Sequence, residues 1–397
     1  MELEVLRARH GDCMLLHFES DDRPKFAIID GGPAGVYKES LRPRLEEMRE
    51  ELDLSDNEPL IIELLVLSHI DDDHANGVVQ MLRDMKNVQD RGDPPRYKIR
   101  RLWHNSFDDI IGNSETETRQ ALASQFGTAS AGMQDIPDDL FEDYRDWQVL
   151  ASINQGHQIR EMAEALGIPA NPDFGGNLIK APDEEDDDIV DQVQLEDATL
   201  TVLGPRSKEL KKLEKDHDKW LKKTGKGRES GEATLAAFKD SSVANLSSIV
   251  LLADDGEKRY LLTGDARGDK IMQAVELRDG LAEDGKLPVE ILKIPHHGSN
   301  NNVAPEFFEA VPASVYVLSG DGKHGNPERD TIEWIEGANK DNPYTLHFTN
   351  PIKAIDKKRK KEYHGDDPYE EETHGVGAFL DSLPDRVTIV APEPDED

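Results

Sequence analysis

Four side chains that can bind metal ions lie within six positions in the segment 68–77, whose sequence is Ser-His-Ile-Asp-Asp-Asp-His-Ala-Asn-Gly. They are His69, Asp71, Asp73 and His74, and they directly follow the apolar run 61–67. Because a β-strand alternates its faces, ligands this close can converge only where the strand ends and the chain turns. Imidazoles combined with carboxylates suit zinc, manganese or ferrous iron, and two carboxylates allow two ions about 3.5–4 Å apart. A solvated acidic turn is the alternative.

Three further apolar runs end in aspartate or histidine. The run 289–295 leads into His296-His297-Gly298-Ser299, the run 259–263 into Gly264-Asp265, and the run 25–29 into Asp30-Gly31-Gly32. One such end is common in α/β proteins, because loops at strand ends are exposed and polar. Four ends that all carry metal-capable side chains predict one shared site.

Together these four motifs resemble the metallo-β-lactamase superfamily, and most closely its ComEC-like branch of hydrolase domains. Their order and rough spacing match across about residues 1 to 340. The usual superfamily motif is His-x-His-x-Asp-His, and Asp71 stands here at the second histidine. The resemblance implies an α/β fold, a metallo-β-lactamase-like αβ/βα four-layer sandwich with helical insertions. It also implies two divalent metal ions, with zinc as the first choice and manganese as the alternative.

The resemblance implies a set of ligands that carries over residue by residue: His69, Asp71, Asp73, His74, Asp265 and His296. Asp265 would bridge both ions, and Asp30 matches the carboxylate that holds a ligand imidazole in one tautomer. Adjacent side chains on an extended segment diverge, so we expect His296 to bind metal and His297 to lie behind it or near the leaving group. The superfamily's third histidine of the first metal has no clear counterpart. His217 is typical of a surface helix, and Asn245 or a water is the alternative.

The chemistry expected of such a site is hydrolysis. Two ions would lower the pKa of a bridging water toward neutrality, and Asp73 would orient the resulting hydroxide. His324, which follows the predicted strand 314–318, could protonate a leaving oxygen. Further candidates for contact with the substrate are Ser299 and the pair His104-Asn105, which follows Trp103 at the end of another predicted strand. Burial of Trp103 beside an incidental polar turn is the alternative for that pair.

The formal net charge is −35, from 82 acidic and 47 basic residues. Such a surface repels polyanions. Basic residues concentrate in 208–228, with nine basic and four acidic side chains, and in 353–361, with six basic side chains and one aspartate. Within the second stretch, Lys357, Lys358 and Arg359 are the predicted phosphate contacts. Solvated helical faces are the alternative for both stretches.

At 397 residues the chain predicts one large domain, 1–392, followed by an acidic tail at 393–397. Expected departures from a compact sandwich are a helical insertion at about 108–181, an acidic loop at about 183–198 and a charged insertion at about 206–242. The longest apolar stretch, 60–70, is too short to span a bilayer, so we expect no membrane partner. The first twelve residues lack a secretory apolar segment, and the single Cys13 suits a reducing compartment, which indicates a cytoplasmic protein.

Hydrophobic periodicity predicts helices at 38–52 and 78–85 and a mainly helical block from 108 to about 181. It predicts strands at 3–7, 14–18, 26–29, 101–104, 199–203, 246–252, 259–263, 289–294, 314–318 and 386–390.

The predicted function is a metal-dependent phosphodiesterase, a nuclease of DNA or RNA, whose partner is nucleic acid or another phosphodiester. A metallo-hydrolase of a small ester, lactone or cyclic nucleotide suits the acidic surface better. A non-catalytic interaction protein, braced by its metals, is the third hypothesis. The linker-like composition of 206–242 also predicts a regulatory partner or a protease that acts there.

Overall fold

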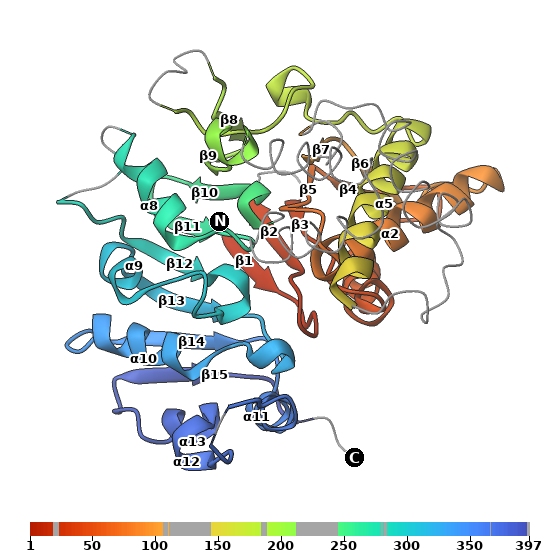
Figure 1. Ribbon diagram of the computed structural model, residues 1–397. Helices are drawn as coiled ribbons and strands as arrows, with labels where there is room; N and C mark the ends of the chain where they lie inside the picture. Colours follow the sequence, from red (N-terminus) through yellow and green to blue (C-terminus); the bar gives the residue numbers. More distant parts are fainter. Residues whose placement is uncertain are drawn as a thin grey trace, which may run out of the picture.

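The computed structural model describes residues 1–18, 24–105, 110, 144–183, 189–211, 245–278, 281, 284–365 and 367–394, with backbone only for 144–154 (Figure 1). Within them the strands form two mixed sheets and a separate parallel pair, β4 (Leu60–Ile62) with β6 (Tyr97–Ile99).

The first sheet has the strand order β1 (Glu2–Val5), β2 (Met14–Phe18), β3 (Lys25–Ile29), β5 (Leu64–Val66) and β7 (Leu102–Trp103). The first three strands form an antiparallel meander, and β5 and β7 run parallel to β3. Met14 pairs with Ile29, so the start of β2 lies beside the end of β3.

The second sheet repeats this plan on a larger scale. Its strands are β8 (Gln192–Leu195), β9 (Ala198–Gly204), β10 (Val250–Asp254), β11 (Arg259–Leu262), β12 (Val289–Lys293), β13 (Ala313–Leu318), β14 (Tyr344–Phe348) and β15 (Val387–Val390). Pairing is antiparallel from β8 to β11 and parallel from β11 to β15. Leu251 pairs with Leu262, so the start of β10 lies beside the end of β11.

The central strands are apolar on both faces, which is why they are buried between layers. In β3, Ala27 and Ile29 join a core shared by both sheets, whereas Phe26 and Ile28 face the opposite way. In β10, Leu251 enters the shared core and Leu252 faces outward. The two sheets therefore pack face to face.

Helices cover the outer face of each sheet (Figure 1). The first sheet is covered by α1 (Arg42–Glu51), α2 (Asp72–Asp90) and α5 (Tyr144–Ala165). The second is covered by α8 (Gly268–Glu276), α9 (Pro305–Ala310), α10 (Arg329–Ala338), α11 (Ile352–Lys361) and α13 (Val376–Leu380), with α12 (Glu371–His374) beside them. The predicted αβ/βα four-layer sandwich is confirmed.

Several element boundaries differ from the expectations. The helix expected at 78–85 begins at Asp72, because the metal-capable loop itself turns into α2. The strand expected at 246–252 begins at Val250, after a 3-10 turn at Asn245–Ser247. Strand β8 lies within the segment predicted as an acidic loop. Most of the insertions at 108–181 and 206–242 lies outside the described residues.

The ends of four parallel strands meet at one edge of the sandwich, as parallel pairing requires. Asp30 follows β3, His69 follows β5, Asp265 follows β11 and His296 follows β12. Because β2 and β10 begin at this same edge, the segments before them, 10–13 and 245–249, arrive there too. Among the described helices, none has the length and apolar character needed to cross a lipid bilayer.

The start of α2 touches the turn after β3 backbone to backbone. Gly31 N–H donates to His74 O at 2.9 Å, and Gly77 N–H donates to Gly32 O at 2.9 Å. A Cβ on Gly77 would lie 1.9 Å from Gly31 O, so the helix must move away to accept any side chain.

We therefore expect Gly77→Ala to lower the free energy of unfolding by about 1–3 kcal/mol in denaturant titrations, because the site is overpacked. The matched control is Gly337→Ala in α10, where a Cβ meets nothing within 4 Å. It should be neutral or stabilising by up to about 1 kcal/mol. Similar destabilisation by both changes would show that the close approach is not needed.

Candidate metal centre

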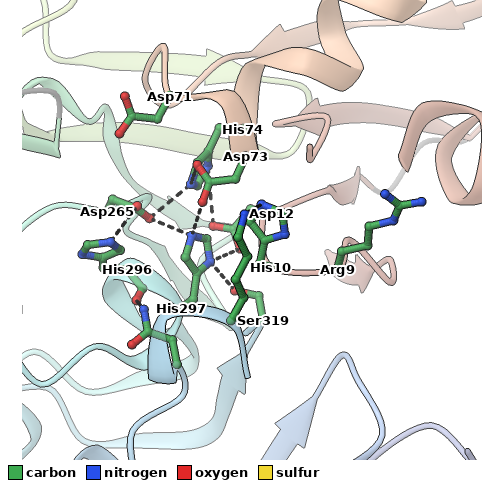
Figure 2. Close-up of polar contacts among 12 residues, drawn as sticks. Arg9, His10, Asp12, Asp71, Asp73, His74, Asp265, His296, His297 and Ser319 are labelled. Atoms are coloured by element: carbon green, nitrogen blue, oxygen red, sulfur yellow. Dashed lines mark hydrogen bonds and ion pairs between the residues drawn. The ribbon is translucent and has the colours of Figure 1, made fainter. Parts of the chain in front are cut away.

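The carboxylate of Asp265 is 2% exposed and lies between four imidazole rings, of which Figure 2 labels His74, His296 and His297. Its Oδ1 is 3.2 Å from His74 Nε2 and 3.6 Å from His297 Nε2. Its Oδ2 is 3.7 Å from His69 Nε2 and 3.6 Å from His296 Nε2. Two imidazole nitrogens therefore face each oxygen.

The other ring nitrogen, Nδ1, of each of these four histidines is hydrogen-bonded to a protein side chain. His74 Nδ1 is 2.8 Å from Asp30 Oδ2, and His296 Nδ1 is 2.7 Å from Asn302 Oδ1. His297 Nδ1 is 3.0 Å from Ser319 Oγ, and His69 Nδ1 is 3.1 Å from Ser68 Oγ. These partners fix each ring so that Nε2 is the nitrogen available for a ligand bond.

Several buried atoms at this point have no hydrogen-bond partner among the described residues. They are Nε2 of His69, His74 and His297, and Oδ1 of Asp265. An unpartnered buried polar atom costs free energy, and buried polar groups are normally satisfied. Nitrogen and carboxylate oxygen are ligands that zinc and manganese accept, so the residues present fit a metal ion.

Asp71, the residue before α2, and Asp73, in its first turn, fall on opposite sides of Asp265. Asp71 Oδ2 is 3.6 Å from His69 Nε2. Asp73 Oδ1 is 3.9 Å from His74 Nε2, and its Oδ2 is 3.4 Å from His297 Nε2. The predicted residues thus form two groups that share Asp265. One contains His69, Asp71 and His296, and the other contains Asp73, His74 and His297.

The expectation of an extended segment at His296-His297 is wrong. Residues 295–298 form a tight turn in which both histidines adopt left-handed backbone conformations, with φ of 49° and 55°. This turn sends the two rings to different oxygens of Asp265, where an extended chain would point them apart. Asp30 and His324 also have positive φ, at 61° and 57°. Such strain is typical of functional sites.

Asp12 belongs to this centre, and the sequence reasoning missed it. It is 1% exposed, lies 3.4 Å from His297 Nδ1 and 3.8 Å from His74 Nδ1, and forms an ion pair with the fully buried Lys293. Asp12, His74, Asp265 and His297 make a buried cluster that could hold metal ions. Asp12 faces the Nδ1 side of both rings, so it orients them from behind. Its position before β2 could have revealed it, because an antiparallel strand begins at the edge of the sheet where its neighbour ends.

Charges within the cluster control protonation. Burial opposes a charge on His297, but the carboxylates of Asp265 and Asp12 outweigh it and raise its pKa to about 9. Burial likewise opposes a charge on His74, yet Asp265 and Asp30 raise its pKa well above the usual value. Burial alone would raise the pKa of Asp265, but the imidazoles of His297 and His74 hold it well below its usual range. Without metal, protons therefore occupy His74 and His297.

His324 lies at the rim of the centre, in a short turn at Lys323–Gly325. Partial burial lowers its pKa, and the ring interacts electrostatically with Asp73 and His296. Asn245, considered as a replacement ligand, reaches His296 Nδ1 at 3.3 Å and so contacts the back of that ring. His217 lies outside the described residues.

Three predicted substrate contacts have partners within the protein. The amide of Asn105 donates to Ile179 O and accepts from Ile179 N, both at 2.8 Å. Its neighbour His104 is buried, and the backbone N–H of His104 donates to Asn171 Oδ1 at 2.9 Å. Ser299 is buried, and its backbone N–H donates to His296 O at 2.9 Å, which closes the turn. These bonds brace the loops beside the site, and a contact of these residues with substrate stays a prediction.

The basic helix α11 also has partners within the protein. Arg359 donates to the carbonyl oxygens of Gly325, Pro327 and His374, so it holds the His324 turn in place. Lys358 forms an ion pair with Asp321, and Lys357 is exposed. Two of the guanidinium nitrogens of Arg359 are thus engaged by carbonyl oxygens, and its contact with phosphate stays a prediction.

The chain matches no protein-family model and no curated protein. One solved structure with some likeness is a beta-lactamase domain protein from Burkholderia ambifaria, at 15% sequence identity and a TM-score of 0.22. The alignment covers 51% of this chain and 44% of that one, less than half of its length. The four-layer fold and the centre described above stand on the residues themselves.

The raised histidine pKa values predict how the metal-free protein responds to pH. Folded His297 binds its proton up to a pKa of about 9, above the ordinary 6.5. Its contribution to stability is therefore complete below pH 6.5 and is lost as the pH rises through 9. In chelator we expect the melting temperature to fall between pH 7 and 9, with up to about 3 kcal/mol lost from this group.

Two controls accompany that measurement. Saturating zinc should remove most of the slope, because metal replaces the protons. His297→Gln should flatten the slope in chelator. An unchanged slope in His297→Gln would contradict the assigned pKa.

Proposed function

We propose that this protein is a metal-dependent hydrolase that holds two divalent ions, one on each side of Asp265. The observation that carries the proposal is the convergence of four imidazole Nε2 atoms on the two oxygens of one buried carboxylate. The residues that would hold the ions are His69, Asp71, Asp73, His74, Asp265, His296 and His297. Two bound ions would supply positive charge for a developing oxyanion and lower the pKa of water.

The protein's own groups prepare this site. Asp30, Asp12, Ser319 and Asn302 fix the rings, so little reorganisation is needed during a reaction. Asp73 presents one oxygen toward His74 and the other toward His297, and its side chain is 24% exposed, which lets it face an incoming water.

His324 is the candidate residue for donating a proton to the leaving group. Because its pKa is lowered, the ring is neutral at pH 7 and offers an N–H hydrogen bond to a leaving oxygen. An anionic substrate would raise that pKa and let the ring transfer a full proton.

We propose a phosphodiester as the substrate. Two cations on one carboxylate suit attack at phosphorus, where the entering and leaving oxygens both carry charge. Helix α11 lies beside the His324 turn, because Glu362 at the end of the helix accepts the backbone N–H of His324 at 2.7 Å. The exposed lysines of α11 are therefore close to the rim of the centre, which supports a polymeric substrate. The net charge of −35 favours a small phosphodiester as the second candidate.

The first test changes the bridging carboxylate. Asp265→Ala should reduce bound zinc from two equivalents to near zero and lower hydrolysis of bis(4-nitrophenyl) phosphate at least 100-fold, measured by elemental analysis and absorbance. Asp269→Ala, an exposed aspartate that pairs with Arg267 in α8, is the matched control and should retain both. Retention of metal and activity in Asp265→Ala would contradict the bridging role. Wild-type protein that binds metal but cleaves no DNA, RNA or small ester would favour a metal-braced interaction protein.

The second test separates polymer from small substrate. Replacing Lys353, Lys357 and Lys361 by Gln should slow cleavage of DNA or RNA several-fold and weaken its salt dependence, because fewer cations meet the backbone. Hydrolysis of bis(4-nitrophenyl) phosphate should change less than twofold. Changing Lys258, Lys286 and Lys340 to Gln is the matched control, since these exposed lysines precede β11, β12 and β14 at the opposite edge. An equal loss of activity on both substrates would show that α11 does not bind the polymer.

A further inference from the structure

Lys323, at the mouth of the centre, is a cation whose ammonium forms no ion pair with any described residue. Its Nζ lies 3.1 Å from His10 Nε2, and the side chain is partly buried. In a chain with 82 acidic and only 47 basic residues, carboxylates outnumber the cations available to them. Lys323 is nevertheless a partly buried lysine that contacts an imidazole beside an aspartate-rich centre.

Asp321, the aspartate closest to Lys323 in sequence, already has a partner for each of its carboxylate oxygens. Asp321 Oδ1 accepts the backbone N–H of Lys323 at 3.0 Å, and Asp321 Oδ2 pairs with Lys358. Asp321 thus caps the turn and balances the charge of α11. The Lys323 ammonium has three donors, and the contact with His10 uses one of them.

His10 connects this lysine to the metal centre. It stands two residues before Asp12, is largely buried and interacts electrostatically with Asp73 and His297. Figure 2 shows His10 next to Asp12, whereas Arg9 points away from the cluster, where it pairs with Glu39. Since a lysine ammonium can only donate, His10 Nε2 must accept, and the imidazole orients the ammonium without neutralising it.

The turn that carries Lys323 is held rigidly. Arg359 bonds the carbonyl oxygens of Gly325 and Pro327, and Glu362 accepts the backbone N–H of His324. A Cβ on Gly322 would lie 2.3 Å from Ile355 O, so the turn also packs directly on α11. A preorganised cation loses less entropy when it binds a ligand than a mobile surface lysine does.

We propose that Lys323 and His10 form an anion subsite, which binds a phosphate oxygen of the substrate next to the metal centre. The inference rests on the proposed hydrolase function and narrows its substrates to esters that carry negative charge at the reacting group. The two ions of the proposed function would be largely balanced by the aspartates that hold them. The Lys323 ammonium, which has no carboxylate partner among the described residues, would add positive charge at the position where the substrate enters.

Binding of inorganic phosphate to the zinc-loaded protein tests the subsite without relying on turnover. By isothermal titration calorimetry we expect Lys323→Met to weaken phosphate binding about tenfold, while Lys323→Arg stays within about threefold of wild type. Lys340→Met, an exposed lysine before β14, should bind as wild type does. All variants should contain the same amount of zinc. Wild-type protein that binds no phosphate, or Lys323→Met that binds it equally well, would overturn the subsite.

Kinetics and a double-mutant cycle supply the second readout. Lys323→Met should raise KM for bis(4-nitrophenyl) phosphate about tenfold and leave hydrolysis of the neutral ester 4-nitrophenyl acetate within twofold. His10→Ala should add little to Lys323→Met, because the two side chains act as a unit. Equal losses on both esters, or fully additive effects, would overturn the subsite even if the protein is a hydrolase. If neither ester is hydrolysed, the proposed function fails, and the phosphate titration still decides the subsite.

Discussion

The structure depends on one electrostatic constraint: Asp265 is buried among four imidazoles, and both it and the buried Asp12 must keep their charge. Burial alone would protonate these aspartates, yet the neighbouring rings and Lys293 hold the pKa values of Asp265 and Asp12 far below the usual range. The same charges raise the pKa values of His74 and His297, so these two rings hold protons when no metal is bound. A divalent ion satisfies both sides of this arrangement, because it replaces protons on nitrogen and balances charge on oxygen.

The sandwich brings these groups together through strand direction. Parallel strands end at the same edge, and antiparallel strands begin at the edge where their partners end. Each sheet combines both kinds of pairing, so its loops reach the centre from two directions. The proposed ligands follow the ends of strands, and Asp12 and Asn245, which contact the backs of the rings, come from segments before strands. Glycines 31 and 77 let α2 approach closely enough for His74 to meet Asp30.

Much of this could be predicted from sequence, because buried strands give continuous apolar runs and their polar ends are visible. The runs before Asp30, His69, Asp265 and His296 located the centre and implied the four-layer fold. Asp12 could not be predicted in this way, because it precedes strand β2 and does not follow an apolar run. The geometry at His296 and His297 needed two left-handed residues, which a short sequence pattern does not reveal. Composition shows a basic helix at α11 but not that Arg359 bonds to carbonyl oxygens.

The account rests on two cations that share Asp265, and crystals grown with zinc test it most directly. Anomalous scattering at the zinc edge should show two peaks about 3.5–4 Å apart, each about 2.0–2.2 Å from one oxygen of Asp265. One peak should lie near His69 and His296, and the other near His74 and His297. No peak beside Asp265, or rings whose Nε2 atoms turn to other partners, would contradict the account.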